Sequence, residues 1–213
     1  MDLKERNQGM KDFFDGKAND YDDNKQSSHL KKRKNKSAII EELKNNIETV
    51  LDLGAGTGLE LIPLFEKFPN TKVTAIDISD NMLEELKGRS FANKVKTICG
   101  DFFELDFGCN YDAVISSAAL HHFNEKDKKE LYTKIYECLK NDGQFINSDR
   151  FVDTQEEQDR LMKEYEETPN LYPHMDTPLT TENEKRILNE IGFKNIKIGN
   201  LEDERYKLLI ATK

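Results

Sequence analysis

The sequence contains no tryptophan, only five prolines and only three cysteines among its 213 residues. The cysteines are Cys99, Cys109 and Cys138, an odd number without a CxxC pair. This argues against a disulfide scaffold and against a cysteine-ligated zinc site. We interpret all three as ordinary thiols, mostly packed, of a protein in the reducing cytoplasm.

Long apolar runs and an excess of basic charge are also absent. No run approaches the roughly 20 apolar residues that span a bilayer, and the charged N-terminus lacks the apolar core of a signal peptide. The 32 basic and 41 acidic residues give a net charge of −9, which provides no bulk attraction to nucleic acid or anionic lipid. We expect neither as a partner, although a tRNA-type substrate bound by a local basic patch stays open. The basic run 31–36 is interpreted as a solvated helix entrance.

Strand-like and helix-like segments alternate between about residues 49 and 150. Predicted strands cover 49–54, 72–77, 94–100, 111–117 and 144–149, and predicted helices cover 59–68, 81–88 and 124–139. This alternation predicts parallel strands joined by crossovers, hence an α/β, Rossmann-like, doubly wound sheet. Such sheets bind ligands beyond the carboxyl ends of their strands.

We predict one domain over residues 1–213 with additions on either side of the sheet. Its parts are an N-terminal helical cover 1–47, a core 48–150, a lid insertion 151–180, and a C-terminal helix and strand pair 181–213. The cover includes an amphipathic helix near Ala38 to Ile47, and the last helix opens at Thr181 and ends at Gly192. A peripheral helix and loop is the alternative to the lid. The oligomeric state, monomer or homodimer, is left open.

The clearest motif is VLDLGAGTG, from Val50 to Gly58. Its glycines follow an apolar strand and open a helix, where a side chain would keep a ligand away from the backbone. A dinucleotide fingerprint requires glycine at the position of Leu59, and the Lys-Ser/Thr pair of a P-loop is missing. The usual cradles for pyrophosphate therefore fit poorly.

Two aspartates follow the next two predicted strands. Asp77 can accept hydrogen bonds from both hydroxyls of a ribose, with a helix cap as the alternative. In GDFFEL, Asp101 can accept from an exocyclic amine and the Phe102 backbone can meet a base edge, although alone Asp101 would be an ordinary turn residue. Together they predict an adenosine-type ligand with an unmodified ribose.

Six segments appear in a familiar order between about residues 12 and 150: FFDGKANDYDD, VLDLGAGTG, AIDISDNML, GDF, YDAVISSAALHHF and LKNDGQFI. With them the chain resembles class I S-adenosylmethionine-dependent methyltransferases, in particular the small-molecule or ubiquinone/menaquinone-like subgroup. The resemblance implies a seven-stranded, mostly parallel sheet with an antiparallel last strand. It implies S-adenosyl-L-methionine as cofactor, S-adenosyl-L-homocysteine as product, and no obligatory metal.

The resemblance also assigns cofactor-binding roles. The turn from Gly54 to Gly58 would bind the methionine part, Asp77 the ribose, and Asp101 with Phe102 the adenine. The full implied set is Tyr21, Asp52, Gly54, Ala55, Gly56, Thr57, Gly58, Asp77, Ile78, Met82, Asp101, Phe102, Ser116 and Ser117. Within it, the two serines would lie beside the sulfonium, and the tyrosine would close the N-terminal segment over the cofactor.

The acceptor side is less defined. His121 and His122 follow the fourth predicted strand, and either can act as a general base because its pKa lies near operating pH. Local packing, or a metal site shared with Asp149, are the alternatives. The candidate substrate-binding residues are Arg150, Tyr165, Tyr172 and His174. The aromatic bodies and polar tips of the lid residues suit a small, partly apolar acceptor.

The sequence thus predicts a methyltransferase that acts on a small molecule. Two other functions fit the same pocket: a tRNA-modifying or modified-cofactor-forming enzyme, and a non-catalytic S-adenosylmethionine-binding protein. The NPPY-type motif of base-amino methylation is replaced by SSAA after the fourth strand, which by resemblance disfavours nucleic acid as the acceptor.

Overall fold

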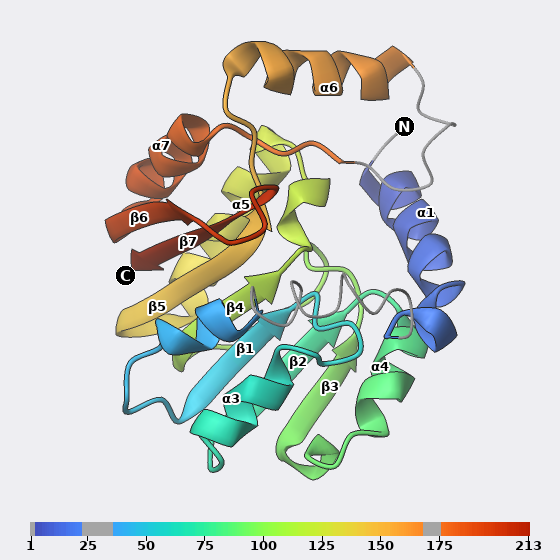
Figure 1. Cartoon of the computed structure of the whole chain (residues 1–213), viewed down its shortest axis with the longest axis vertical. Helices are drawn as coiled ribbons and strands as arrows, with labels where there is room; N and C mark the ends of the chain where they lie inside the picture. The colour runs from blue at the N-terminus through green and yellow to red at the C-terminus, as the bar shows by residue number, and fades with distance from the viewer. Residues whose placement is uncertain (1–2, 23–35, 168–175) are drawn as a thin grey trace.

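The computed structural model describes residues 3–22, 36–167 and 176–213. Tyr172, His174 and most of the basic run lie outside these ranges. Within them, the centre is a seven-stranded sheet in the order β3-β2-β1-β4-β5-β7-β6 (Figure 1). The strands are β1 Thr49–Leu53, β2 Lys72–Asp77, β3 Val95–Cys99, β4 Tyr111–Ser117, β5 Leu139–Arg150, β6 Lys194–Asn200 and β7 Tyr206–Thr212.

The direction of the strands agrees with the sequence prediction. β7 pairs antiparallel with β5 and with β6, whereas all other neighbours pair parallel. The predicted Rossmann-like sheet with an antiparallel last strand is therefore confirmed. β7 is inserted between β5 and β6, so the seventh strand in chain order lies inside the sheet and not at its edge.

The central strands are buried on both faces, which explains their nearly continuous apolar sequences. Successive side chains point to opposite faces of a sheet. Leu51 and Val114 accordingly belong to one core, and Val50 and Ile115 belong to the core on the other face. All four side chains are fully buried.

Helices cover both faces. They are α1 Leu3–Asp15, α3 Leu61–Lys67, α4 Asp80–Lys87, α5 Glu125–Cys138, α6 Gln155–Glu167 and α7 Thr181–Ile191, with short 3-10 turns η1 Ala18–Asp20, η2 Ala92–Lys94 and η3 Leu120–His122. α5 and α7 pack on one face through Leu131 and Ile187, and α3 and α4 pack on the other through Leu64 and Leu83. α1 lies beside α4, while α6 extends over the top of the molecule (Figure 1).

The start of α4 differs from the sequence prediction. The helix was predicted to begin at Asn81, but it begins at Asp80, and its cap is Ser79, whose hydroxyl accepts a hydrogen bond from the Met82 N–H at 3.1 Å. The segment DISDN offers several capping side chains in succession. Only the extended backbone of Ser79, which the sequence does not reveal, selects one of them.

α7 shows the same one-residue difference. Its cap is Thr180, which accepts from the Asn183 N–H at 3.2 Å, and not Thr181. Two other predicted boundaries are confirmed. Asn124 caps α5, and Gly192 ends α7 with a φ of 115°, a left-handed conformation that favours glycine.

The predicted amphipathic helix near Ala38 to Ile47 is shorter than expected, because the helical conformation ends at residue 41. The backbone N–H of Lys44 donates to the Gln144 side chain on β5 at 2.8 Å, so it is not available to a continuing helix. The apolar side of the segment is nevertheless buried as far as Ile47.

The cysteines also differ in part from expectation. Cys138 is buried, but Cys99 and Cys109 are exposed, so the expectation that most are packed is wrong. All three are free thiols. Within the described ranges, no helix combines the length and the apolar composition needed to cross a membrane.

Candidate functional site

A cavity of about 740 Å³, which includes part of its open mouth, lies where β1, β2, β3 and β4 end. Eleven of the predicted cofactor-binding residues line it: Tyr21, Gly54, Ala55, Gly56, Thr57, Asp77, Ile78, Met82, Asp101, Phe102 and Ser117. The sequence therefore located the cavity correctly.

Three of the predicted residues do not line the cavity. Asp52 is fully buried within β1, and Gly58 faces Leu86 of α4. Ser116 donates its hydroxyl proton to the Leu53 carbonyl at 2.7 Å, a bond between neighbouring strands. Side chains alternate along a strand, so of the two serines only Ser117 reaches the cavity.

The glycine turn follows β1. The space beside its first glycine is filled by the protein, and the space beside its second glycine is empty. Gly54 has a φ of 75°, and a Cβ added there would come within 2.4 Å of the Ala119 Cβ. Gly56 also has a positive φ, 52°, but an added Cβ would meet no atom within 4 Å. Gly54 is thus required by the packing of the protein itself, whereas the space beside Gly56 is open for a ligand.

Asp77 ends β2 next to this turn. Its carboxylate accepts hydrogen bonds from the Gly56 N–H at 2.7 Å and from the Ser79 N–H at 2.8 Å. Burial raises the pKa of Asp77 to about 6, despite the opposing effect of these backbone donors. A carboxylate has about four lone-pair sites, so further donors can still bind.

Asp101 lies at the far end of the cavity and contacts the N-terminal helix. It accepts a hydrogen bond from the Asn7 side-chain amide at 2.6 Å and from the Phe103 N–H at 2.9 Å. Asn7 is itself buried, and its Oδ1 atom has no hydrogen-bond partner among the described residues. A buried acceptor without a donor is costly, and a ligand donor would relieve this cost.

Charged groups surround the other end of the glycine turn. Lys36 lines the cavity and forms an ion pair with Glu60, which is buried. Burial and the neighbouring Glu60 raise the pKa of Asp52 well above its ordinary value. This end of the cavity therefore presents a lysine ammonium in front of two buried acids.

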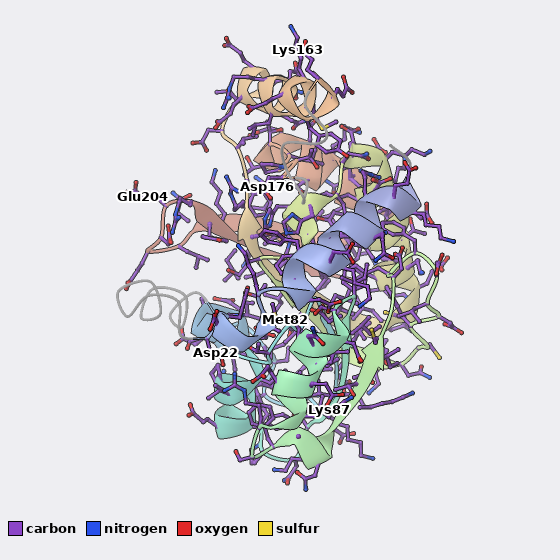
Figure 2. All side chains as sticks on the ribbon, turned by 90° about the vertical axis from the view of Figure 1, so that its right-hand side faces the viewer. Asp22, Met82, Lys87, Lys163, Asp176 and Glu204 are labelled. Carbon is purple, nitrogen blue, oxygen red and sulfur yellow. The ribbon has the colours of Figure 1, made fainter. Side chains whose placement is uncertain are left out.

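The N-terminal segment lines one side of the cavity with Asn7, Met10, Phe14 and Tyr21, and α1 faces the viewer in Figure 2. In α1, Asp15 accepts from the Ser79 hydroxyl at 2.6 Å. After η1, Asp22 accepts from the Thr57 hydroxyl at 2.7 Å and pairs with Arg89. The segment is thus tied both to α4 and to the glycine turn.

Several lining residues of the cover were not predicted. Asn7, Met10 and Phe14 all come from α1, and they are spaced three and four positions apart. That spacing puts them on one face of a helix and is a signal that the sequence does contain. What the spacing does not show is that this face covers the cavity and not another part of the molecule.

The two histidines differ in position. His122 lines the cavity, whereas His121 lies behind it and bonds to Asp149 with its Nδ1 atom 2.5 Å from Oδ1. Asp176 approaches both rings, 3.4 Å from the His121 Nε2 atom and 3.1 Å from the His122 Nδ1 atom. Burial alone would lower the pKa of His121, but the carboxylates of Asp149 and Asp176 raise it to about 9.

The candidate substrate residues are not gathered at the cavity. Arg150 pairs with Asp176 and does not line it. Tyr165 belongs to α6, and its hydroxyl is buried without a hydrogen-bond partner among the described residues. Tyr172 and His174 lie outside the described residues.

Comparison with known proteins agrees with this geometry. The profile of a family described as "Methyltransferase domain" matches residues 50–143, which include the glycine turn, Asp77 and both histidines. An uncharacterized methyltransferase of Staphylococcus carnosus is 32% identical over 167 residues, covering 75% of this chain and 77% of the relative.

A second relative and a solved structure extend the comparison. A carboxy-S-adenosyl-L-methionine synthase of Nautilia profundicola is 27% identical over 186 residues, covering 78% of this chain and 79% of the relative. Magnesium protoporphyrin IX methyltransferase from Synechocystis PCC 6803, solved with bound SAH, superposes with a TM-score of 0.72 at 19% identity and covers 96% and 98% of the two chains. The superposition shows that the two proteins share a fold. The chain spans less than two thirds of some other solved neighbours, 60% in one case.

Proposed function

Since the chain belongs to the class I S-adenosylmethionine-dependent methyltransferases, we propose that it transfers the methyl group to a small-molecule acceptor in the cavity at the ends of β1 to β4. S-adenosyl-L-methionine is the cofactor, and it supplies a methyl group on a positively charged sulfur. The finer assignments, which residues hold the cofactor and what the acceptor is, are argued below from the contacts of the cavity.

We assign the adenosine part of the cofactor to the side of the cavity formed by β2 and β3. Asp77 has unused acceptor sites for the ribose hydroxyls, and Asp101 is placed to accept from the adenine amine. Ile78, Met82 and Phe102 supply the apolar walls of this part. The unpartnered Oδ1 atom of Asn7 is a further acceptor for the same ligand.

The methionine part is assigned to the glycine turn. The open space beside Gly56 lets a ligand approach the backbone closely. Lys36 lies on this side, and its ammonium is suited to the carboxylate of the amino-acid tail. The buried Glu60 behind it is already paired with this lysine. The proposal thus assigns the tail carboxylate to Lys36.

We place the acceptor beside Met10, Phe14, Phe123 and His122, the last of which is the one histidine of the pair that lines the cavity. Three apolar side chains and one imidazole suit a small, partly apolar molecule. His121 is set behind this wall, and its raised pKa of about 9 keeps it protonated at neutral pH. A protonated imidazole cannot accept a proton, so His122 is the residue that we propose to face the acceptor.

The observation that carries the small-molecule assignment is the cover. α1 is tied by Asp15 to α4 and by Asn7 to Asp101 after β3, and the N-terminal segment is tied by Asp22 to the glycine turn. A closed cover aligns the reactants and excludes water, and both contribute to methyl transfer. A nucleic-acid acceptor would instead need an open, basic surface at the cavity mouth.

The test uses methyl-labelled S-adenosylmethionine with a metabolite extract and, in parallel, with total tRNA. Label in a small molecule supports the proposal, and label in tRNA overturns it in favour of an RNA-modifying enzyme. Mass spectrometry of the cofactor pool detects a modified cofactor, which would also contradict methyl transfer. If S-adenosylhomocysteine binds in calorimetry but no fraction is labelled, the chain is a binding protein and the proposal is wrong. The Asp77→Asn variant is the negative control for labelling.

A further inference from the structure

The two neighbouring histidines and Asp176 bring three potential metal ligands together at one point. One ring nitrogen of His121, one of His122 and one carboxylate oxygen of Asp176 all lie within 4.8 Å of one another. The Asp176 Oδ1 atom is 3.4 Å from the His121 Nε2 atom and 3.1 Å from the His122 Nδ1 atom. We infer that these three residues form a binding site for a divalent first-row transition ion of the Zn²⁺ type.

The spacing of the three atoms suits direct coordination. An ion with ligand bonds of about 2.1 Å holds two neighbouring ligand atoms roughly 3.0 to 3.4 Å apart, depending on whether the geometry is octahedral or tetrahedral. The separations of the Asp176 Oδ1 atom from the two ring nitrogens, 3.1 and 3.4 Å, fall in this range, and the two nitrogens lie within 4.8 Å of each other. Two imidazoles with one carboxylate form a set typical of zinc and of non-haem iron.

The outer contacts of the cluster favour the same interpretation. A metal-binding histidine usually donates its other ring nitrogen to a carboxylate, which fixes the tautomer and the direction of the ring. His121 has this arrangement, because its Nδ1 atom lies 2.5 Å from the Asp149 Oδ1 atom and its Nε2 atom faces Asp176. Asp149 is itself held by the N–H groups of Leu120 and His121, at 2.8 and 3.0 Å.

The charges of the cluster leave room for a cation. Asp149 and Asp176 contribute two negative charges, and Arg150, which pairs with Asp176, contributes one positive charge. In the ion-free chain the proton of His121 balances the remaining negative charge, and a bound ion would take the place of that proton. The nearby Lys128 is already paired with the buried Glu184. Buried charge is costly unless it is compensated, so the cluster gains either from protonation or from a bound ion.

The metal site would lie at the wall of the cavity, where an ion could contact the acceptor. His122 lines the cavity beside Phe14, whose ring lies 5.9 Å from the imidazole. An ion here would lie at the wall on the acceptor side, where it could bind a hydroxyl oxygen of the acceptor and make that hydroxyl more acidic. This last role rests on the proposed function, whereas binding of the ion itself does not.

Two of the three ligands of this site were singled out from the sequence. The adjacent histidines are visible, and Asp149 was considered as their third partner. In the structure, Asp149 supports His121 from behind, and the third ligand atom comes from Asp176, 54 positions after His122. The backbone N–H of Thr177 donates to the His121 carbonyl at 2.8 Å and holds Asp176 beside the histidines, a contact between distant residues that the sequence does not reveal.

The experiment is equilibrium dialysis of the chelator-treated full-length protein against Zn²⁺, followed by metal analysis. We expect one ion per chain. Co²⁺ serves as a spectroscopic probe, and its visible absorption should indicate nitrogen and oxygen ligands without a thiolate band. Replacing the exposed thiols in a Cys99→Ser, Cys109→Ser variant should leave binding unchanged, which excludes adventitious capture of zinc by cysteine.

Two variants test the assignment of ligands. Asp176→Asn should weaken Zn²⁺ binding by a factor of ten or more, and Asp149→Asn by about 10 to 100-fold as a supporting group. Asp153→Asn, which removes an exposed acid paired with Lys207, is the matched control and should bind as the unaltered chain does.

The result that overturns the inference is binding of less than stoichiometric Zn²⁺, or stoichiometric binding that Asp176→Asn does not weaken. Calorimetry with S-adenosylhomocysteine separates this outcome from failure of the proposed function. If the cofactor product binds normally while Zn²⁺ does not, only the metal site is wrong. If neither binds to a folded chain, both are wrong.

Discussion

The carboxylate of Asp77 accepts a hydrogen bond from the backbone N–H of Gly56 at 2.7 Å, so the end of β2 holds the glycine turn that follows β1. The same carboxylate is the proposed partner of the cofactor ribose. One side chain therefore shapes the turn and offers its remaining lone pairs to the ligand, and a change at this position affects both.

Replacing the acid by its amide tests the second role. In Asp77→Asn, one acceptor oxygen becomes a donor and the charge is lost, so the charge-assisted hydrogen bonds to ribose disappear. Such bonds contribute about 1.5 to 3 kcal/mol each. We expect the affinity for S-adenosylhomocysteine to fall by at least tenfold in calorimetry.

The control for Asp77→Asn is Asp112→Asn. Asp112 also accepts backbone hydrogen bonds, including one from the Thr49 N–H at 2.9 Å, but it lies at the opposite end of the strands. It should destabilise the fold without changing cofactor affinity. Equal loss of affinity in both variants would contradict a specific role of Asp77.

The pH dependence of binding follows from the raised pKa of Asp77, about 6. Ribose hydroxyls stabilise the ionised form, so binding requires loss of the proton. Affinity for S-adenosylhomocysteine should be constant above about pH 7 and should fall below pH 6, by up to about tenfold per pH unit. Calorimetric titrations from pH 5 to 8 measure this, and the slope should vanish in Asp77→Asn. A flat profile in the unaltered protein would refute the prediction.

The stability of the ligand-free protein should depend on Asp77 in the opposite sense. The folded pKa is raised above the ordinary value of 3.8, so the folded chain binds this proton more tightly than the unfolded chain. The contribution of this group to stability is greatest below about pH 4 and decreases as the pH rises to about 6. Urea unfolding of the unaltered chain and of Asp77→Asn at pH 4.5 and 7 isolates the contribution of Asp77, because the amide of the variant does not titrate.

Two substitutions in the glycine turn should have different consequences. Gly54→Ala places a Cβ 2.4 Å from Ala119 in a left-handed conformation, and both effects destabilise the fold, by about 2 to 5 kcal/mol in total. Gly56→Ala meets no atom within 4 Å, so only the backbone strain of about 1 to 2 kcal/mol remains.

Of the two substitutions, Gly56→Ala is the one that tests binding of the cofactor. The space beside Gly56 is the proposed position of the methionine part, so Gly56→Ala should bind S-adenosylhomocysteine at least tenfold more weakly while staying folded. Urea unfolding and calorimetry together separate the two effects. Normal affinity in Gly56→Ala would show that the cofactor does not approach this part of the backbone.

The connection between α1 and α4 can be tested at Ser79. Ser79→Ala removes the cap of α4 and the hydrogen bond to Asp15, and we expect a loss of about 1 to 3 kcal/mol in unfolding free energy. Asn81→Ala is the control, since this exposed side chain donates only to the Asp15 carbonyl and should cost about 0.5 kcal/mol or less.

The same pair of variants reports on the cover. Each variant removes one hydrogen bond between α4 and Asp15 of α1. Hydrogen exchange of residues 3–15 should be faster in Ser79→Ala than in Asn81→Ala, because Ser79 bonds the charged carboxylate and also caps α4. It should become slower on cofactor binding in the unaltered protein. Exchange in α1 that neither the variant nor the ligand alters would contradict its role as a cover.

The sequence was sufficient for the sheet and for the cofactor side of the cavity. Buried parallel strands have continuous apolar sequences, and glycines at 54 and 56 with an acid at the end of the next strand identify the ligand edge by local pattern alone. Asp77 and Asp101 were found in this way. Each of them lines the cavity close to the end of the strand that carries it, so no long-range information was needed to place it there.

The cover and the acceptor side could not be predicted to the same extent. Asn7 and Phe14 reach the cavity only because α1 crosses the strand ends. Asp176 contacts His122 although 54 positions separate them in the chain. The prediction that Ser116 lines the cavity was wrong for a local reason. Whether it or Ser117 faces the cavity depends on where the alternation of β4 begins, and a shift of one residue reverses the answer.

The place of β7 between β5 and β6 has a consequence for how the protein is made. Synthesis proceeds from the N-terminus, and segments that have left the ribosome begin to fold before the rest exists. β1 to β5 can pair as they emerge, but β6 has no neighbour in this sheet until β7 has been translated. The edge of β5 therefore stays unpaired in the nascent chain until β7 has been translated, and this topology exposes that edge to wrong pairing for the whole of that time.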